Sequence, residues 1–452
     1  MSWLQGLNPM VQDVLAAFGR ALLFVLPIFM AVPFLIWFER RLLAWFQDRH
    51  GPNRTGNITF SRSSRYVPNF LRGRKIQFQG LAQSMADGIK LFTKEDILPK
   101  HTDLVLFLIA PAISLFVALS LGGTLPWGPF PKLTPVSDAN IGLLYILAIS
   151  SLGAYGSVLA GYSSNNKYSL MGGLRAGAQL ISYELAMGVS LGGMVMATGS
   201  LKMTEIVHAQ EGPLWGVIPF LQNWNLFTPF GALSGIVFFI CMLAETNRPP
   251  FDLPEAENEL VAGYHTEYST KRWGLFMMAE YIAMLVFSLI FWTVFGGGYN
   301  LLPVRWDWLA ANTGSLGSIF GVIGTVFAWL SPVTMLIKGA IGIFVYIWIR
   351  GTYPRLRYDQ LMNLGWKTLL PLATANLITI ATWIVVTRVY GTAAGWATAI
   401  LIFILGFGIL GMLRRHKGPD PILATRTVGY APETPRAAPT PIEDERELEP
   451  VA

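Results

Sequence analysis

The segment GLFMMAEYIAMLVFSLIFWTVFG, residues 274–296, decides the fold, because it contains a single charged residue, Glu280, in an otherwise apolar run. A helix of about 20 such residues crosses the hydrocarbon core of a bilayer. Eight further stretches have the same character, namely residues 14–38, 103–123, 141–162, 177–199, 228–245, 322–349, 366–388 and 393–413. The sequence therefore predicts an all-α fold, a polytopic transmembrane helical bundle of about nine spans.

The composition and the distribution of charge agree with a membrane protein. Of the 452 residues, 53% are hydrophobic and only 13% are charged, whereas soluble domains carry about 25% charged residues. Lys and Arg gather in residues 39–102 and in alternate later loops, and cytoplasmic loops retain such residues. We therefore expect the N-terminus outside and the C-terminus in the cytoplasm. The basic pI of about 9.3 then reflects topology, and nothing supports nucleic-acid binding.

The chain divides into a membrane domain and a tail. Residues 1–413 are predicted to form the transmembrane domain, in which residues 39–102 are a long basic loop and residues 245–273 an acidic loop. Residues 414–452 are rich in proline and carboxylates, and we expect a disordered tail. Near the end of the basic loop, an amphipathic helix at the membrane surface is predicted from the helical spacing of Leu81, Met85, Ile89 and Phe92.

The sequence lacks the ligand sets of the common redox cofactors. Cys241 is the only cysteine, so a Cys-ligated iron–sulfur cluster or zinc site cannot be completed within the chain. A transmembrane haem needs histidines inside the spans, but the histidines fall in predicted loops or the tail, at His50, His101, His208, His265 and His416. The sequence contains no G-x-G-x-x-G motif that opens a strand–helix unit and no phosphate-binding loop. We therefore expect no flavin, haem, iron–sulfur cluster or metal in this chain.

The acidic loop contains the most informative local sequence, ETNRPPFDLPEAENELVAGYHTEY, residues 245–268. Its prolines forbid a continuous helix, so the fifth span must break there, and Asp252 with Glu255 resembles an N-cap that starts a short helix. Glu255 and Glu259 would lie on one face of that helix, where like charges repel. The stretch is either an acidic solvated loop or a cluster of coupled carboxylates with Arg248 as counter-ion.

Charged residues inside the predicted spans strengthen the second interpretation. Glu184 and Glu280 lie within the fourth and sixth spans, and intramembrane carboxylates by default indicate an ion or proton path. Lys338 lies within the seventh span and is equally compatible with a functional role or with a structural counter-charge. Arg20 and Arg388 lie near span ends and are interpreted as snorkelling anchors.

The exit of the first span, WFERRLLAWFQDRHGPNR, mixes aromatic residues with arginines. It fits an interfacial belt with positive-inside anchors. It equally fits a helix that lines the entrance for an amphipathic ligand, and periodicity does not separate the two.

Five long blocks resemble the H subunit of bacterial respiratory complex I. They are ERRLLAWFQDRHGPNR, ADGIKLFTKED, GYSSNNKYSLMGGLRAGAQLISYE, AETNRPPFDLPEAENELVAGYHTEYS and IRGTYPRLRYDQLMNLGWK, spread in order over roughly residues 30–370. The resemblance implies that this chain is a component of NADH–quinone oxidoreductase in the bacterial cytoplasmic membrane. Its implied roles are to form most of the quinone tunnel and to couple quinone reduction to proton pumping. The quinone would be a substrate, and the partners would be the peripheral-arm and membrane-arm subunits of complex I and the lipid bilayer.

The resemblance also implies two groups of functional residues. Those of the quinone tunnel and its entrance would be Arg40, Arg49, Asp87, Arg350 and Arg355. Those that couple quinone chemistry to the proton path would be Glu184, Glu245, Arg248, Asp252, Glu255, Glu257, Glu259, Glu267 and Glu280. Departures from the family pattern are the insertion at residues 55–78, Ser84 in place of a common proline, a ninth span and the acidic tail.

Two other functions remain open from the sequence. A membrane subunit of an energy-converting hydrogenase or formate hydrogenlyase shares the charge pattern without a quinone, although GPNR and ETNRPPFDLPEAENEL favour the quinone enzyme. A stand-alone ion-coupled transporter also uses intramembrane carboxylates, but it needs paired broken helices. The sequence contains one strong break, at residues 249–254.

Overall fold

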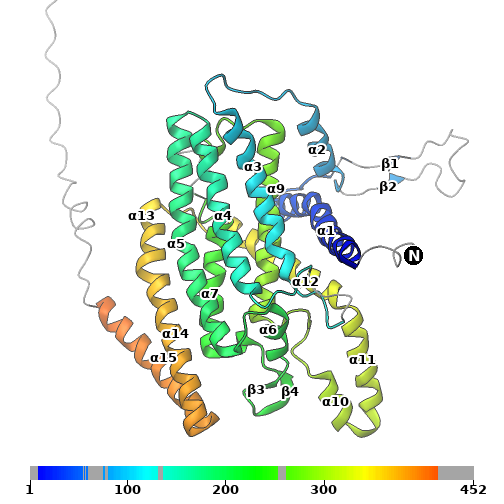
Figure 1. Cartoon of the computed structure of the whole chain (residues 1–452), viewed down its shortest axis with the longest axis vertical. Helices are drawn as coiled ribbons and strands as arrows, with labels where there is room; N and C mark the ends of the chain where they lie inside the picture. The colour runs from blue at the N-terminus through cyan, green and yellow to red at the C-terminus, as the bar shows by residue number, and fades with distance from the viewer. Residues whose placement is uncertain are drawn as a thin grey trace, which may run out of the picture. The chain divides into compact units, whose positions relative to one another are not determined.

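The computed structural model describes residues 9–53, 55, 58–59, 75–76, 80–130, 136–252 and 261–415. Among these residues, seven helices are long and apolar enough to cross a membrane, and the chain is an all-α multi-pass membrane protein, as predicted. Figure 1 shows α3, α4, α5, α7 and α9 running alongside one another, with α1 oblique to them. The only sheets in this part of the chain are the short antiparallel pairs β1–β2 and β3–β4.

The elements follow one another in this order: α1 (Pro9–Phe46), β1 (Ile58–Thr59), β2 (Lys75–Ile76), α2 (Gln83–Thr93), α3 (Leu104–Leu121), η2 (Gly122–Thr124), α4 (Gly142–Ser163), α5 (Lys167–Thr198), α6 (Met203–Ala209), β3 (Pro213–Leu214), β4 (Ile218–Gln222), η4 (Asn225–Phe227), α7 (Pro229–Glu245), η5 (Gly263–His265), α9 (Thr270–Phe295), α10 (Trp306–Asn312), η6 (Gly314–Leu316), α11 (Gly317–Trp329), α12 (Ser331–Thr352), α13 (Tyr358–Leu364), the π-helical turn η7 (Gly365–Leu369), α14 (Leu370–Tyr390) and α15 (Thr392–Arg415).

Three spans begin at side-chain caps that the sequence encodes locally. The Asp103 carboxylate accepts from the amides of Val105 and Leu106 at the start of α3. Asn166 and Thr228 cap α5 and α7 in the same way. Each cap satisfies an amide that the first helical turn leaves without a partner, so these three helix starts are set by residues next to them in sequence.

The fourth span begins ten residues earlier than predicted, at Lys167 instead of residue 177. Its first turns are rich in glycine, which lowers hydropathy but allows close packing. A Cβ at Gly173 would lie 3.1 Å from the Cα of Gly161 on α4, and one at Gly172 would lie 2.7 Å from the backbone of Gly263. The helix is therefore stabilised by backbone contact rather than by apolar side chains, and Glu184 lies about 25 Å along it.

Other predicted boundaries also differ from the structure. The segment predicted as one span at residues 322–349 is two helices, α11 and α12, which separate at Leu330 because Ser331-Pro332 starts a new helix. The fifth predicted span is the 17-residue α7, shorter than the other spans. His208, predicted to lie in a loop, lies in the short helix α6.

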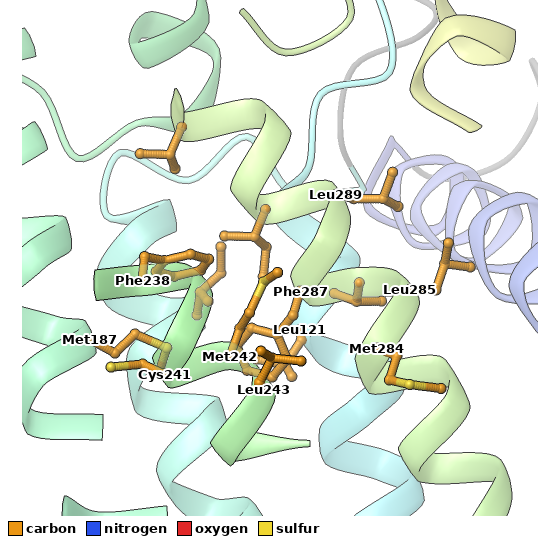
Figure 2. Packing of buried hydrophobic residues seen from close by; sticks show 14 of the residues in the cluster. Leu121, Met187, Phe238, Cys241, Met242, Leu243, Met284, Leu285, Phe287 and Leu289 are labelled. Atoms are coloured by element: carbon orange, nitrogen blue, oxygen red, sulfur yellow. The ribbon is translucent and has the colours of Figure 1, made fainter. Parts of the chain in front are cut away.

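The main hydrophobic core lies between α7, α9 and their neighbours (Figure 2). Phe238 and Met242 of α7 contribute to it from one side, and Phe287 of α9 from another. Cys241 is buried in the same core as a free thiol. Since lipid is as apolar as this core, tight side-chain packing holds the helices together.

Lys338 is buried in this region with 2% of its surface exposed. Its ammonium donates to the carbonyls of Gly296, Gly298 and Asn300 at distances of 2.5, 2.9 and 2.5 Å. It also lies 4.4 Å from the ring centre of Trp224. These contacts favour the structural alternative, in which the lysine holds the turn that follows α9.

The predicted surface helix is α2, and its apolar residues are exposed, with Met85, Ile89 and Phe92 each more than 60% accessible. Most of the 55–78 insertion and residues 416–452 of the tail lie outside the described residues. Contacts divide the chain into residues 1–399 and 400–452. Within the second unit, the structure describes only residues 400–415, which are the end of α15. They lie within the region predicted as the ninth span.

Candidate functional site

The break after α7 is held by a buried glutamine that the sequence did not single out. The helix ends at Glu245, and the Nε2 of Gln179 on α5 donates to the carbonyls of Ala244 and Phe251 at 2.8 and 2.9 Å. Gln179 therefore ties both ends of the segment 245–252 to α5. A further hydrogen bond holds the middle of this segment, because the carbonyl of Pro250 accepts from the amide of Leu356 at 3.1 Å.

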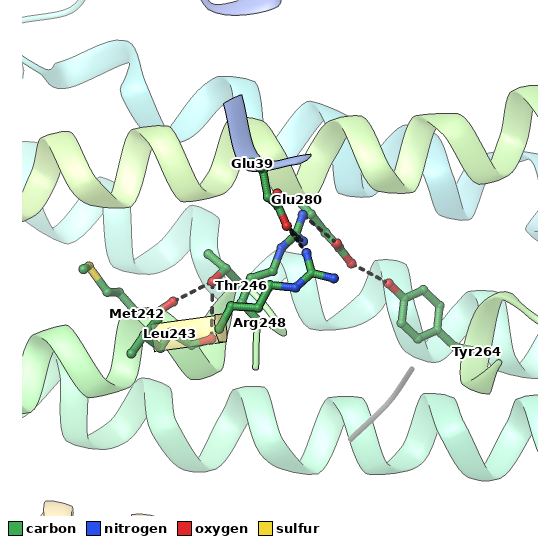
Figure 3. Close-up of polar contacts among 8 residues, drawn as sticks. Glu39, Met242, Leu243, Thr246, Arg248, Tyr264 and Glu280 are labelled. Atoms are coloured by element: carbon green, nitrogen blue, oxygen red, sulfur yellow. Dashed lines mark hydrogen bonds and ion pairs between the residues drawn. The ribbon is translucent and has the colours of Figure 1, made fainter. Parts of the chain in front are cut away.

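Arg248 extends from this segment between two carboxylates of other helices (Figure 3). Its Nη1 lies 3.6 Å from Oε1 of Glu39 on α1, and its Nη2 lies 3.7 Å from Oε2 of Glu280 on α9. The guanidinium also lies 4.5 Å from the ring centre of Tyr281. Only 8% of Arg248 is exposed, so this cation joins three segments inside the protein. The predicted role of Arg248 as an internal counter-ion therefore has a geometric basis.

Glu39 is the functional candidate that sequence reasoning missed. It is 4% exposed and accepts a short hydrogen bond from Nη1 of Arg350 besides its ion pair with Arg248. We call Glu39, Arg248, Glu280 and Arg350 the charge cluster. The available signal was helical spacing, because Glu39 falls on the same face of α1 as the buried Leu35 and Leu42. Its position beside Arg40 and Arg41 made it look like part of a charged flank.

A cavity of about 80 Å³ adjoins the charge cluster. Its acidic lining residues are Glu245 and Glu280, and its other polar groups include Tyr264 and serines of α3 and α4. The Tyr264 hydroxyl donates to Oε1 of Glu280 at 3.3 Å. Oε2 of Glu245 is buried with no hydrogen-bond partner among the described residues. The lining is mostly apolar but includes these polar groups, and the cavity is large enough for water, which would satisfy this oxygen.

Glu184 lies on the α5 side of this region. It is partly buried and lies near Glu245, with which it interacts electrostatically. It also lies near Ser150 of α4, which lines the cavity. The structure therefore places Glu245 and Glu280, predicted as members of one functional group, on the same cavity, with Glu184 of that group beside Glu245.

The remaining predicted acidic residues lie at the edge of this arrangement. Asp252 is buried, with 7% exposed, and its Oδ2 lies 3.1 Å from Nη2 of Arg355. Glu267 accepts from Asn166 at 2.7 Å, at the start of α5. Glu255, Glu257 and Glu259 lie outside the described residues, as does most of the short helix predicted to begin at Asp252.

The residues predicted for a tunnel do not form one group. Arg350 and Arg355 pair with the acidic residues Glu39 and Asp252. Arg40 instead pairs with Asp87 of α2 at 2.6 Å, which connects α1 to the surface helix. Arg49 is exposed and donates to Gln47 at 2.7 Å.

Aromatic residues near the exit of α1 keep both interpretations of that segment open. The Arg41 guanidinium lies 5.7 Å from the ring centre of Trp37 and 5.5 Å from that of Trp45. Trp45 and Phe46 are exposed, as expected of an interfacial belt and equally of an apolar entrance.

Tyr268 anchors the acidic segment to α3. Its ring stacks on Phe107 at 4.0 Å, and its hydroxyl donates to the Phe107 carbonyl at 3.2 Å. Burial raises the pKa of Tyr268 to about 12, so the phenol stays protonated near neutral pH. The return of the chain from the acidic loop to α9 is therefore firmly positioned.

We expect Gln179→Leu to disturb this site while retaining the fold. The substitution removes the donor for the Ala244 and Phe251 carbonyls, and an unsatisfied buried polar group costs about 1–3 kcal/mol. Hydrogen exchange at residues 246–252 should become faster in the purified complex, and quinone-dependent activity should fall. Asn312→Leu, which replaces an exposed amide on α10, is the control. Unchanged exchange in the Gln179 variant would contradict the anchoring role.

Taken together, the fold and the site define a multi-pass α-helical membrane protein with carboxylates and arginines paired between its helices. Charges buried at membrane depth are costly, and they mark ion or proton paths by default. Interacting carboxylates also titrate as a coupled set, so a charge change at one alters the protonation of the others. This arrangement suits a protein that responds to a nearby change of charge.

The comparisons with known proteins identify the family. Residues 19–381 match the family described as NADH dehydrogenase. The chain is 41% identical over 350 residues to the H subunit of NADH-quinone oxidoreductase from Flavobacterium johnsoniae, an alignment that covers 76% of this chain and 87% of the relative. It is 39% identical over 387 residues to an H subunit of the same enzyme from Koribacter versatilis, covering 82% and 97%. It is 40% identical over 388 residues to one from Geobacter metallireducens, covering 84% and 100%.

The chain therefore belongs to the NADH dehydrogenase family, together with these H subunits, and the predicted resemblance is confirmed. The family match ends before α15 begins, in agreement with the prediction that the ninth span lies beyond the common core.

Proposed function

We propose that this chain is the membrane subunit of a proton-translocating NADH–quinone oxidoreductase, in which it forms the access tunnel for the quinone and couples quinone reduction to proton translocation. The names of the relatives support the enzyme complex. The quinone is the substrate of that complex, and its redox cofactors belong to partner subunits of the peripheral arm. Other membrane-arm subunits pack against helices at the outer surface of the bundle. The chain lies in the bacterial cytoplasmic membrane with its N-terminus outside and its C-terminus in the cytoplasm.

One observation carries the coupling part of this proposal. The Arg248 guanidinium lies within 3.7 Å of carboxylates from both α1 and α9, and Glu280 borders the cavity that also contains Glu245. Reduction of a quinone to a quinol takes up two electrons and two protons. A change of charge beside Glu39 would alter the pairing of Arg248, and through it the protonation of Glu280 and its neighbours.

The tunnel part of the proposal places the quinone on the α1 side of the charge cluster. The Arg40–Asp87 pair joins α1 to α2, and the exposed aromatic residues Trp45 and Phe46 provide an apolar surface for an isoprenoid substrate. Arg350, which is 37% exposed and paired with Glu39, would stand between this surface and the buried acids. In this arrangement the quinone headgroup approaches the charge cluster without entering the hydrophobic core.

We expect Glu245→Gln to lower quinone reductase activity by about tenfold, which corresponds to about 1.4 kcal/mol in the activation barrier. The amide keeps the size of the side chain but cannot release a proton. The measurement is inhibitor-sensitive NADH–quinone activity and proton uptake in membrane vesicles, normalised to assembled complex. Glu205→Gln, an exposed acid of α6, is the control.

Normal activity and pumping of Glu245→Gln in an assembled complex would contradict the coupling role. Purification of the chain with a nickel-containing hydrogenase would instead favour the hydrogenase alternative. Purification as a small particle that carries no partner subunits would favour a transporter.

A further inference from the structure

A second polar pocket lies at the end of the bundle where α9 and α12 meet the loop of residues 296–305, away from the charge cluster. Its volume is about 390 Å³, and its walls come from α6, β4, this loop, α10 and α11. The residues that matter here are Glu211, Asn300, Arg305, Trp306 and Asp307, and we call it the Arg305 pocket. None of them was predicted as a site residue, and the proposed quinone chemistry does not use them.

The pocket presents groups of both charges. Arg305 supplies a guanidinium whose Nη1 donates to the Pro219 carbonyl at 3.1 Å, which leaves its other donors for a ligand. Glu211 and Asp307 supply carboxylates, and Asp307 lies in the first turn of α10. Oε2 of Glu211 also lies 3.1 Å from Nδ1 of His208, another lining residue, and its lone pairs can accept from a further donor. Nδ2 of Asn300 is buried with no hydrogen-bond acceptor among the described residues. The pocket therefore has donors for an anion beside acceptors for a cation.

The walls of the pocket are rigid and partly aromatic. Trp306 stacks on Phe327 of α11 with ring centres 5.5 Å apart, and the Tyr299 hydroxyl donates to Oε1 of Glu211 at 3.3 Å. Burial, reinforced by the Glu211 carboxylate, raises the pKa of Tyr299, so this phenol remains a donor. The carbonyl of Asn300 is held by Lys338. A pre-formed site of this kind binds a ligand with little ordering cost.

The position of the pocket at the membrane decides what occupies it. Residue 299 follows the end of span α9 at Phe295, so the pocket lies near the level of the lipid headgroups. Leu302, which lines the pocket, is exposed, and α11 exposes further large apolar residues that include Ile319, Val322 and Val326. A ligand with a polar, doubly charged end and a long apolar part matches both surfaces.

We propose that the Arg305 pocket binds the headgroup of an amine-containing zwitterionic phospholipid, of the phosphatidylethanolamine class. The phosphate pairs with Arg305 and accepts from Asn300, and the ammonium lies between Glu211 and Asp307 beside the aromatic wall, where cations are also attracted to ring faces. The acyl chains lie along α11. This inference does not depend on the proposed quinone chemistry.

The experiment measures lipid retained by the purified, detergent-exchanged complex. Wild type and variants are incubated with mixed micelles of phosphatidylethanolamine or phosphatidylglycerol, and bound lipid is quantified by mass spectrometry after gel filtration. Glu211→Gln and Asp307→Asn should each weaken phosphatidylethanolamine binding at this site by about tenfold, because charge-assisted hydrogen bonds are lost. Arg305→Gln should reduce it as well. Lys202→Gln, which removes a cation paired with Asp138 outside the pocket, should have no effect.

Each alternative outcome would overturn the proposal. Equal retention by wild type and both carboxylate variants would show that the pocket does not hold the ammonium. Equal binding of phosphatidylglycerol would exclude recognition of a zwitterion. Displacement of the lipid by water-soluble phosphoethanolamine at the same concentration would make this a site for a free solute. The carboxylate variants keep the test valid if Arg305→Gln disturbs folding through its contact with Pro219.

Discussion

Glu39→Gln is expected to abolish most of the quinone reductase activity of the assembled complex, with a loss of at least about a hundredfold. Its carboxylate lies between the guanidiniums of Arg350 and Arg248, and 4% of the residue is exposed. Under the proposed coupling, removing this charge uncouples Arg248 from a charge change at the quinone, and a hundredfold loss of activity corresponds to about 2.7 kcal/mol in the activation barrier.

The measurement for Glu39 is activity per assembled complex, with assembly followed by native electrophoresis. Glu39→Asp retains the charge and should recover part of the activity, which a purely steric effect would not predict. Glu95→Gln removes an exposed acid of the loop after α2 and should leave activity unchanged. If Glu39→Gln is fully active, the charge cluster is not part of the coupling path, whatever the role of Glu245.

Lys338→Met is expected to produce the largest loss of stability. The substitution removes the donor for three carbonyls of the turn after α9, and an unsatisfied buried polar group costs about 1–3 kcal/mol. Even with partial relaxation, a loss of about 3 kcal/mol or more in the free energy of unfolding follows. The amount of assembled complex should fall sharply, and the melting temperature of the remainder should drop.

Lys202→Met is the control for Lys338, because Lys202 forms an ion pair with Asp138 at a partly exposed site, where such pairs contribute little to stability. A Lys338→Met complex with normal assembly and melting temperature would contradict the structural role. If that complex also lost proton translocation, Lys338 would belong to an ion path, which is the alternative that the sequence left open.

The sequence was sufficient for many features that depend on near neighbours, although the local break at Ser331-Pro332 was missed. Long apolar runs placed Glu184 and Glu280 inside spans, because the bilayer selects about 20 consecutive apolar residues. The prolines of residues 249–254 predicted the end of α7, since proline cannot continue a helix. The spacing of Met85 and Ile89 predicted α2. Where the local signal was weak, as in the glycine-rich start of α5, the predicted boundary was wrong by ten residues.

Pairing between distant residues was decided by the tertiary structure alone. Glu39 and Arg350 are 311 positions apart, and nothing near either residue indicates the other. Gln179 looked like an ordinary polar residue of a span, because the carbonyls that it binds belong to another helix and a broken loop. Lys338 was ambiguous for the same reason, since its partners are backbone groups that carry no sequence signature.

The sequence by itself determined that this is a multi-pass helical membrane protein of the NADH dehydrogenase family, with carboxylates in and near its spans. Hydropathy, proline positions and motif identity are properties of the chain read in order. The tertiary structure decided which charges face one another, that Glu39 belongs with Arg248 and Glu280, and that a second polar pocket forms around Arg305. Those outcomes depend on how the helices cross and pack. Where two helices cross, residues far apart in sequence come into contact, and their distance along the chain does not predict that contact.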